Sequence, residues 1–158
     1  MLIVGAFDED GNATVRIRIS GDGGANDYTA IVDTGFSGFV AMPQIEMIPL
    51  GLATEPAAAS VMLGNGDTIY NLVATATVTI SGREESGSIL LDETTNDVLV
   101  GMAFLRKFEL ALILTDNAII LHDRAETLEA VAQFMATAPA GSPNINPLAA
   151  GTNGLGNE

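Results

Sequence analysis

Short runs in which apolar and polar residues alternate recur between Ala13 and Leu121. In Ala13–Ser20, three branched apolar residues alternate with Arg16 and Arg18, and this period of two predicts a strand with one buried face. Similar runs predict strands at residues 27–32, 38–42, 60–63, 69–80, 88–91, 98–100, 109–114 and 118–121, with short helices at residues 43–52 and 102–108. So many short strands predict a mainly β domain.

Turn-forming residues separate several of these strands. The run Gly64-Asn65-Gly66 lies between two strand-like segments and predicts the tip of a hairpin. Ser81–Glu85 contains Gly82 and two glutamates, and its composition predicts a solvated turn. The segment Asp8–Asn12 has oxygen-bearing side chains at alternate positions, but its glycine is misplaced for a calcium loop, so a hairpin turn is the better interpretation.

The pattern changes near the C-terminal end of the sequence. At residues 123–136, Leu128, Val131 and Met135 fall at helical spacing, which predicts an amphipathic helix. Residues 137–158 consist mostly of Ala, Gly, Pro, Asn and Ser, which bury too little apolar surface to become ordered and predict a flexible tail. The expected division is therefore a β domain at residues 1–122, a helix at 123–136 and a tail at 137–158.

One segment places a reactive group directly after a strand. Asp33-Thr34-Gly35 follows the apolar strand end Ile31-Val32, so its carboxylate is held at the edge of a sheet. Gly35 lets the backbone turn close to the carboxylate without a side-chain clash. The Thr34 hydroxyl can lock the loop by hydrogen bonding. A simple turn at the strand end is the alternative interpretation of the same residues.

A second motif, Leu99-Val100-Gly101, follows much later and precedes the predicted helix at residues 102–108. The chain thus has two apolar residues before Asp-Thr-Gly, then a hairpin, and then two apolar residues and Gly before a helix. This order of motifs resembles that of the retropepsin-like aspartic peptidases, and most of all that of their bacterial single-domain members. The resemblance covers residues 1–122. It implies a closed acid-protease β-barrel in which the second motif packs beside the Asp-Thr-Gly loop, and a flap formed by the hairpin between them.

The resemblance also implies an aspartic endopeptidase that cuts extended polypeptides. That reaction needs two carboxylates that share one proton, and the sequence holds one Asp-Thr-Gly. The expected enzyme is therefore a homodimer in which each subunit contributes Asp33. Strands at residues 2–7 and 119–122 would supply the dimer sheet. No metal or organic cofactor is expected.

The site residues that the resemblance implies fall into three groups. Asp33 is the expected catalytic residue, and Thr34, Gly35 and Ser37 form its loop. The expected substrate-binding residues are Leu63, Gly64, Asn65 and Gly66 in the flap and Phe36 and Val100 in the cleft. Phe36 departs from the family, which often has Ala or Ser there, and a phenyl ring cannot donate a hydrogen bond to the carboxylate. A catalytically silent dimerisation or peptide-binding module of the same fold is therefore the alternative function.

Composition narrows the possible partners. The net charge is −14, from 20 acidic and 6 basic residues, which disfavours nucleic acid and anionic membrane surfaces as ligands. The sequence has no cysteine, so disulfides and thiol catalysis are excluded. It shows no signal peptide or membrane-spanning run, and a cytoplasmic location is expected.

Two other classes of protein were weighed against the peptidase. The single histidine, His122, would have to serve any Ser-His-Asp site, but the sequence has no nucleophile elbow and His122 fits an ordinary strand end. An adhesive or carbohydrate-binding β-sandwich would use a similar density of strands. It predicts a monomer in which Asp33 has no role.

Overall fold

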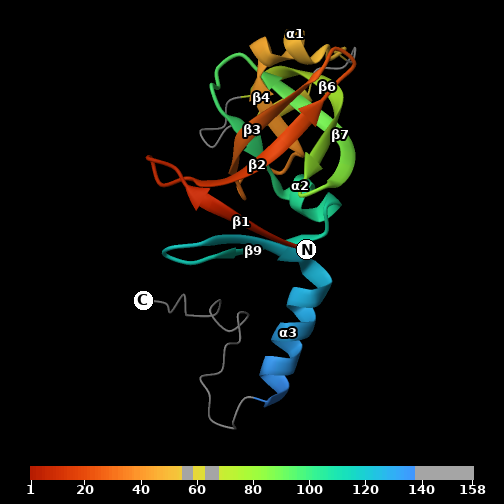
Figure 1. Cartoon of the computed structure of the whole chain (residues 1–158). Helices are drawn as coiled ribbons and strands as arrows, with labels where there is room; N and C mark the ends of the chain where they lie inside the picture. The colour runs from red at the N-terminus through yellow and green to blue at the C-terminus, as the bar shows by residue number, and fades with distance from the viewer. Residues whose placement is uncertain (55–58, 63–67, 138–158) are drawn as a thin grey trace, which may run out of the picture.

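The computed structural model describes residues 1–54, 59–62 and 68–137. Figure 1 shows a barrel of strands, a smaller sheet below it and one long helix that projects away from that sheet. The strands are β1 (Leu2–Phe7), β2 (Ala13–Ser20), β3 (Ala25–Val32), β4 (Val40–Pro43), β5 (Ala59–Met62), β6 (Thr68–Ile80), β7 (Arg83–Asp92), β8 (Val98–Val100), β9 (Leu110–Leu114) and β10 (Ile119–Asp123). The helices are η1 (Gln44–Glu46), α1 (Met47–Leu50), α2 (Met102–Lys107) and α3 (Arg124–Thr137).

Six strands close into a barrel in the order β2, β6, β7, β4, β8, β3. The closing contact is the antiparallel pairing of β2 with β6, from Arg18↔Thr79 to Ser20↔Thr77. Alternate residues of each strand face inward, so the apolar residues of β2 are buried and both its arginines are exposed. The mainly β, closed-barrel fold predicted from the sequence is confirmed, and with it an adhesive β-sandwich is excluded.

Aliphatic side chains fill the barrel, and one aromatic cluster seals it beside α2. Phe104 and Phe108 come from α2 and the residue after it, and their ring centroids lie 4.6 Å apart. The Phe39 ring lies 5.7 Å from that of Phe104, in a tilted arrangement, and 6.3 Å from that of Phe108, on which it stacks. Because Phe39 directly precedes β4, this cluster fixes α2 against the loop that carries Asp33. The predicted short helix after Gly101 is therefore present and has a clear structural role.

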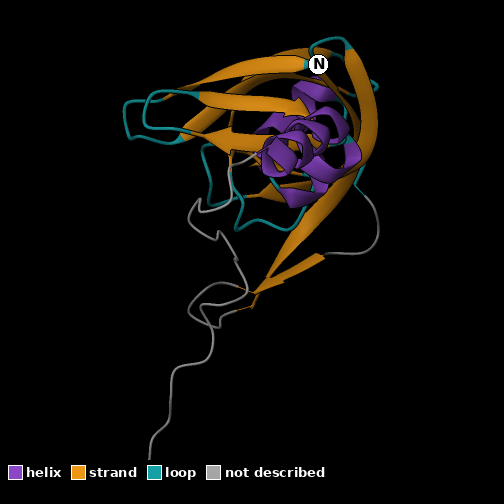
Figure 2. Cartoon of the chain, turned by 90° about the horizontal axis from the view of Figure 1, so that it is seen from below, coloured by secondary structure: helices purple, strands orange, loops and turns teal. Residues whose placement is uncertain are grey.

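The long strand β6 belongs to two structures. Its C-terminal part pairs with β7 and β2 in the barrel, and its N-terminal part pairs with β5 from Met62↔Thr68 to Ala59↔Asn71. Seen from below in Figure 2, the paired β5 and β6 extend beyond the barrel as an arm. The two arms of the predicted hairpin thus pair as expected, while its tip, at residues 63–67, lies outside the described residues.

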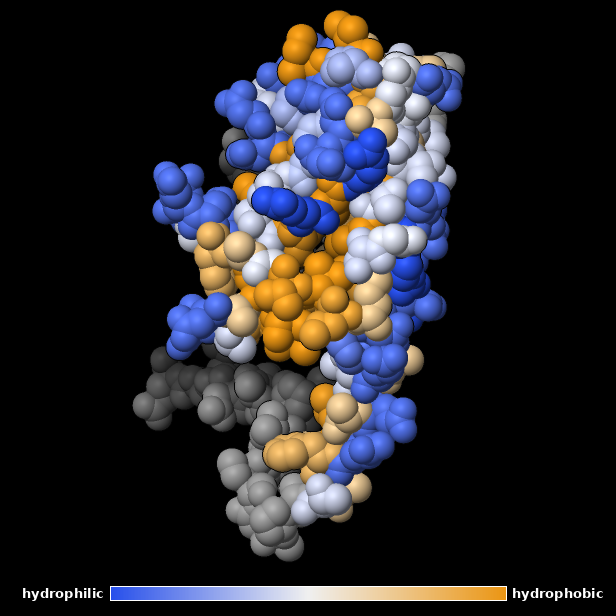
Figure 3. Space-filling view, viewed as in Figure 1, coloured by the Kyte–Doolittle hydropathy of each residue, from blue (hydrophilic) through white to orange (hydrophobic). Residues whose placement is uncertain are grey.

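Strands β1, β10 and β9 form a separate antiparallel sheet below the barrel. After Gly5, β1 passes from pairing with β10 to pairing with β2, and a Cβ atom at Gly5 would lie 2.3 Å from the Thr14 carbonyl oxygen. The upper face of this sheet packs on the core through Leu121, which is fully buried. On the opposite face Leu2 and Val4 are 62% and 69% exposed. Figure 3 shows the apolar surface that gathers over β1 and β9.

Two local predictions need correction in their extent. The short helix predicted at residues 43–52 is present over a narrower range, as η1 followed directly by α1, and the chain leaves α1 at Gly51, which has a left-handed backbone (φ 63°, ψ 38°). The turn predicted over Ser81–Glu85 is confined to Ser81 and Gly82, both with positive φ, and β7 begins at Arg83. Glu84 and Glu85 belong to a long strand paired along β6, where exposed strand positions accept charge.

The predicted C-terminal helix is present as α3, which includes Thr137. The rest of the predicted tail, from residue 138 onward, lies outside the described residues. Among the residues that the structure describes, no helix has the length and apolar character needed to cross a membrane.

Candidate active site

Asp33 lies where the barrel brings the two sequence motifs together. Strand β8 lies between β3 and β4, parallel to β3 and antiparallel to β4. The register Val32↔Val100 places the ends of β3 and β8 side by side, so Asp33 and Gly101 leave the sheet at the same edge. Both motifs were predicted to be neighbours, and the strand pairing gives the physical reason.

The Asp33 carboxylate is oriented by its own loop. The Asp33 backbone N–H donates to the Val100 carbonyl oxygen at 3.0 Å, which joins the loop to β8. Its Oδ1 accepts a hydrogen bond from the Gly35 N–H at 2.8 Å. Within the described part of the chain, Oδ2 has no hydrogen-bond donor. The side chain is partly exposed, so one carboxylate oxygen is held and the other is open to a ligand.

The first turn of α2 locks the rest of this loop. The N–H groups at the start of a helix have no partner within the helix. Here Met102 N–H donates to the Phe36 carbonyl oxygen at 2.8 Å and Ala103 N–H donates to that of Gly38 at 3.1 Å. Gly101 N–H donates to the Phe39 carbonyl oxygen at 3.1 Å. Three consecutive donors therefore hold the loop against β8 and α2.

Gly101 is required by this close packing. A Cβ atom at Gly101 would lie 2.4 Å from the Phe36 carbonyl oxygen and 2.5 Å from the Gly38 carbonyl oxygen. Gly38 is similarly restricted, because its Cβ would lie 2.3 Å from the Phe36 ring. The Phe36 side chain is thus folded over its own loop. It presents an apolar surface over this loop.

The remaining predicted site residues are placed as follows. Thr34 and Ser37 are exposed, and neither hydroxyl has a hydrogen-bond partner in the part of the chain that the structure describes. Val100 is fully buried in the core. Leu63, Gly64, Asn65 and Gly66 lie outside the described residues.

One neighbouring residue was missed by the sequence analysis. Leu99 points to the opposite side of β8 from Val98 and Val100 and is partly exposed. It pairs with Ile31, two residues before Asp33. The alternation along β8 was the available sequence signal, but a strand of three apolar residues does not show which face is open.

The described residues form no metal centre that could compete with this loop. In the described ranges, no group of three or more His, Asp or Glu side chains is arranged to hold a metal ion. Tyr28 has a strongly perturbed pKa, raised to about 12 by burial and by its hydrogen bond to Glu46, but it lies near η1, on β3 well before the strand end that carries Asp33.

Comparison with solved structures assigns the fold. The chain is similar to a retropepsin-like aspartic protease from Rickettsia conorii, with a TM-score of 0.56 and 20% identity, over 77% of this chain and 90% of that one. It is also similar to EIAV protease in complex with an inhibitor, with a TM-score of 0.54 and 15% identity, over 68% of this chain and 98% of that one. No family model matches the sequence, and no curated protein matches it.

The chain therefore has the retropepsin-like fold, as the two sequence motifs predicted. Identities of this size establish the fold alone, and what the chain does must be argued from its own site.

Proposed function

We propose that this chain is an aspartic endopeptidase that acts as a homodimer. The observation that carries the proposal is the Asp33 loop: a partly exposed carboxylate, fixed at one oxygen and open at the other, at the end of β3 in a retropepsin-like fold. Residues 1–122 form the proposed catalytic unit.

The chemistry follows from pairing two such loops. Two Asp33 carboxylates that face each other cannot both ionise readily, so they share one proton. The ionised carboxylate takes a proton from a water molecule, and the protonated one donates to the oxygen of the scissile carbonyl. The hydrogen bond from Gly35 N–H keeps Oδ1 of each carboxylate in place, which leaves Oδ2 for the partner and the water.

The surroundings of Asp33 support a polypeptide substrate. Strands β5 and β6 flank the predicted flap residues, Leu63 to Gly66, in the sequence, and a flap of this kind would bind an extended peptide as an added strand. Phe36 and Leu99 offer apolar surface near the loop, so we expect apolar residues on either side of the cut. The Thr34 hydroxyl is available to bridge to the partner's loop, and Ser37 is available to the substrate.

The decisive experiment compares the wild type with Asp33→Asn on a diverse peptide mixture between about pH 4 and 7. Asp22→Asn is the matched control, because Asp22 is exposed and lies in the β2–β3 turn, at the opposite end of β3 from Asp33. We expect the wild type and Asp22→Asn to make the same cuts, and Asp33→Asn to make none while it stays folded.

A peptide-binding module without catalysis is the second candidate, and Phe36 favours it. The ring occupies the position after Gly35 and brings no donor to the carboxylate. If a folded dimeric wild type binds peptides but cuts none at any pH tested, this second function replaces the first.

A further inference from the structure

Helix α3 exposes an unusual amount of apolar side chain. Over its 14 residues, Leu128, Val131, Phe134 and Met135 are 54–67% exposed. At about 100° per residue, all four fall within an arc of about 120° on the helix surface. Figure 1 shows that α3 leaves the sheet and runs away from the barrel. A stripe of this kind on a projecting helix marks an interaction surface.

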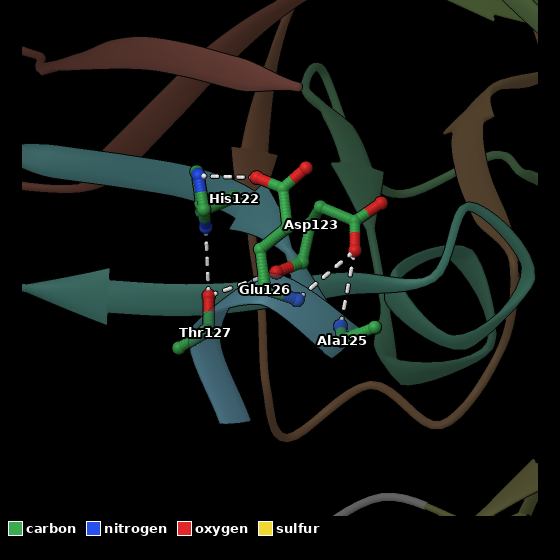
Figure 4. Close-up of polar contacts among 5 residues, drawn as sticks. All are labelled: His122, Asp123, Ala125, Glu126 and Thr127. Carbon is green, nitrogen blue, oxygen red and sulfur yellow. Dashed lines mark hydrogen bonds and ion pairs between the residues drawn. The ribbon is translucent and has the colours of Figure 1, made fainter. Parts of the chain in front are cut away.

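The first turn of α3 is fixed by a compact set of polar contacts (Figure 4). Asp123 Oδ1 accepts hydrogen bonds from the N–H groups of Ala125 at 3.0 Å and Glu126 at 3.4 Å, as in a helix N-cap. His122, at the end of β10, contacts Thr127 Oγ1 through Nδ1 at 2.9 Å and Glu126 Oε2 through Nε2 at 3.2 Å.

Backbone contacts tie the same turn to both neighbouring strands. Arg124 N–H donates to the Glu109 carbonyl oxygen at 2.8 Å, just before β9. Asp123 N–H donates to the Met1 carbonyl oxygen at 3.1 Å, just before β1. The start of α3 is therefore attached rigidly to the lower sheet, and the sheet sets the direction in which the apolar stripe points.

The charges on α3 exclude a membrane as the natural occupant of this stripe. Helices that lie on membranes usually carry Lys and Arg on the polar face. The polar face of α3 carries Glu126, Glu129 and Gln133, and its one basic residue, Arg124, is at the first position. Anionic lipid would be repelled by this face and by the net charge of −14.

A second copy of the chain fits the stripe better. Leu128, Val131 and Met135 are spaced by three and then four residues, which is the seam of a paired helix. The seam is flanked by Ala125, Thr127, Ala132 and Phe134, none of which is charged. Two copies that each carry −14 repel one another, which favours a contact without unpaired acidic groups. The glutamates of α3 lie away from the seam and leave it free.

We propose that α3 pairs with α3 of a second copy and helps to hold together the dimer that brings two Asp33 loops face to face. The catalytic consequence rests on the proposed function, whereas the pairing does not. Four helical turns are too short to pair stably alone. The lower sheet also exposes Leu2, Val4 and Ile113, and a second copy that covered them would enlarge the contact.

The first test measures dimer dissociation by analytical ultracentrifugation of the full chain. The variant Leu128→Glu/Val131→Glu places two charges on the seam, and Ala130→Glu/Gln133→Glu places the same two charges, at the same spacing, away from it. We expect the seam variant to weaken dimerisation at least tenfold, equivalent to about 1.4 kcal/mol, and the control to match the wild type. A wild type that stays monomeric, or a seam variant that dimerises like the control, would overturn the inference.

A cross-linking test covers the case in which the seam variant loses its helix. The natural chain has no cysteine, so a single introduced thiol reports contacts between copies. Under mild oxidation, Val131→Cys should form a disulfide-linked dimer and Gln133→Cys should not. Equal cross-linking of the two contradicts pairing through this face.

The two proposals fail in different ways. Peptide cleavage by a seam variant with unchanged dimerisation keeps the peptidase and removes the role of α3. Dimerisation that depends on α3 without any cleavage keeps the pairing and removes the peptidase.

Discussion

The contact between Gly101 and the Asp33 loop leads to a sharp prediction for Gly101→Ala. The new methyl group would lie 2.4 and 2.5 Å from the carbonyl oxygens of Phe36 and Gly38. An ordinary contact begins at 3.4 Å, so the loop and β8 must separate by about 1 Å (3.4 − 2.4). Both oxygens are backbone atoms that accept hydrogen bonds from α2, so no side chain can rotate away to make room.

The magnitude follows from two contributions. Forcing an extra carbon into a packed region costs about 1–3 kcal/mol. Weakening the hydrogen bonds from Met102 and Ala103 adds about 1 kcal/mol between them, because the donors stay partly paired. The expected loss in the free energy of unfolding is therefore about 2–4 kcal/mol. The same shift displaces Asp33, because its N–H donates a hydrogen bond to the Val100 carbonyl oxygen on β8. The rate of peptide cleavage should therefore fall even under conditions in which the variant is fully folded.

Urea denaturation measures this loss directly. With a slope of about 1.5 kcal/mol/M, the midpoint should fall by about 1–3 M while the slope stays unchanged. Gly24→Ala is the matched control, since its Cβ would make a single close contact, 3.2 Å from the Pro49 carbonyl oxygen, and should cost less than about 1 kcal/mol. If Gly101→Ala unfolds at the same urea concentration as Gly24→Ala, the loop is not locked in the way described.

Two further predictions concern pH. Burial and the hydrogen bond to Glu46 raise the pKa of Tyr28 from 10.0 to about 12. The stabilisation that the neutral Tyr28 side chain provides is therefore complete below pH 10 and is lost as the pH rises toward 12. The free energy of unfolding of the wild type should exceed that of Tyr28→Phe below pH 10, and the difference should shrink between pH 10 and 12. Hydrogen bonds from the N–H groups of Glu126 and Ala125 lower the pKa of Asp123 below 3.8, so its contribution is present above that pH and is lost under stronger acid. Circular dichroism should show that the wild type loses helix in acid. The variant Asp123→Ala should have less helix already at neutral pH, and its helix content should depend less on acid.

The sequence predicted most of what depends on local pattern. Alternation in β2 identified its buried face, and Asp33 and Gly101 were correctly placed at strand ends. The strand order was not accessible in this way. The pairing of β2 with β6 and the position of β10 between β1 and β9 join distant segments, and no local period records them.

The structure also corrected how charge was interpreted. Glu84 and Glu85 were assigned to a turn because they are charged, yet they lie in β7 opposite Thr79 and Val78. The locking of the loop by Met102 and Ala103 was invisible for a different reason. It depends on backbone oxygens of the loop, and every residue type carries those.

The Asp33 loop and helix α3 both present side chains to solvent in fixed positions. Around Asp33 several backbone groups are hydrogen-bonded, whereas Oδ2 and the Thr34 hydroxyl have no partner in the described ranges. On α3 the first turn is fully engaged, whereas Leu128 and Phe134 are exposed. In both places the fold holds side chains in position and leaves them open to solvent, and an exposed apolar stripe of this kind marks a surface that a partner covers. A second copy of the chain would satisfy both with one symmetry axis, so dimerisation and catalysis should respond together to changes on α3.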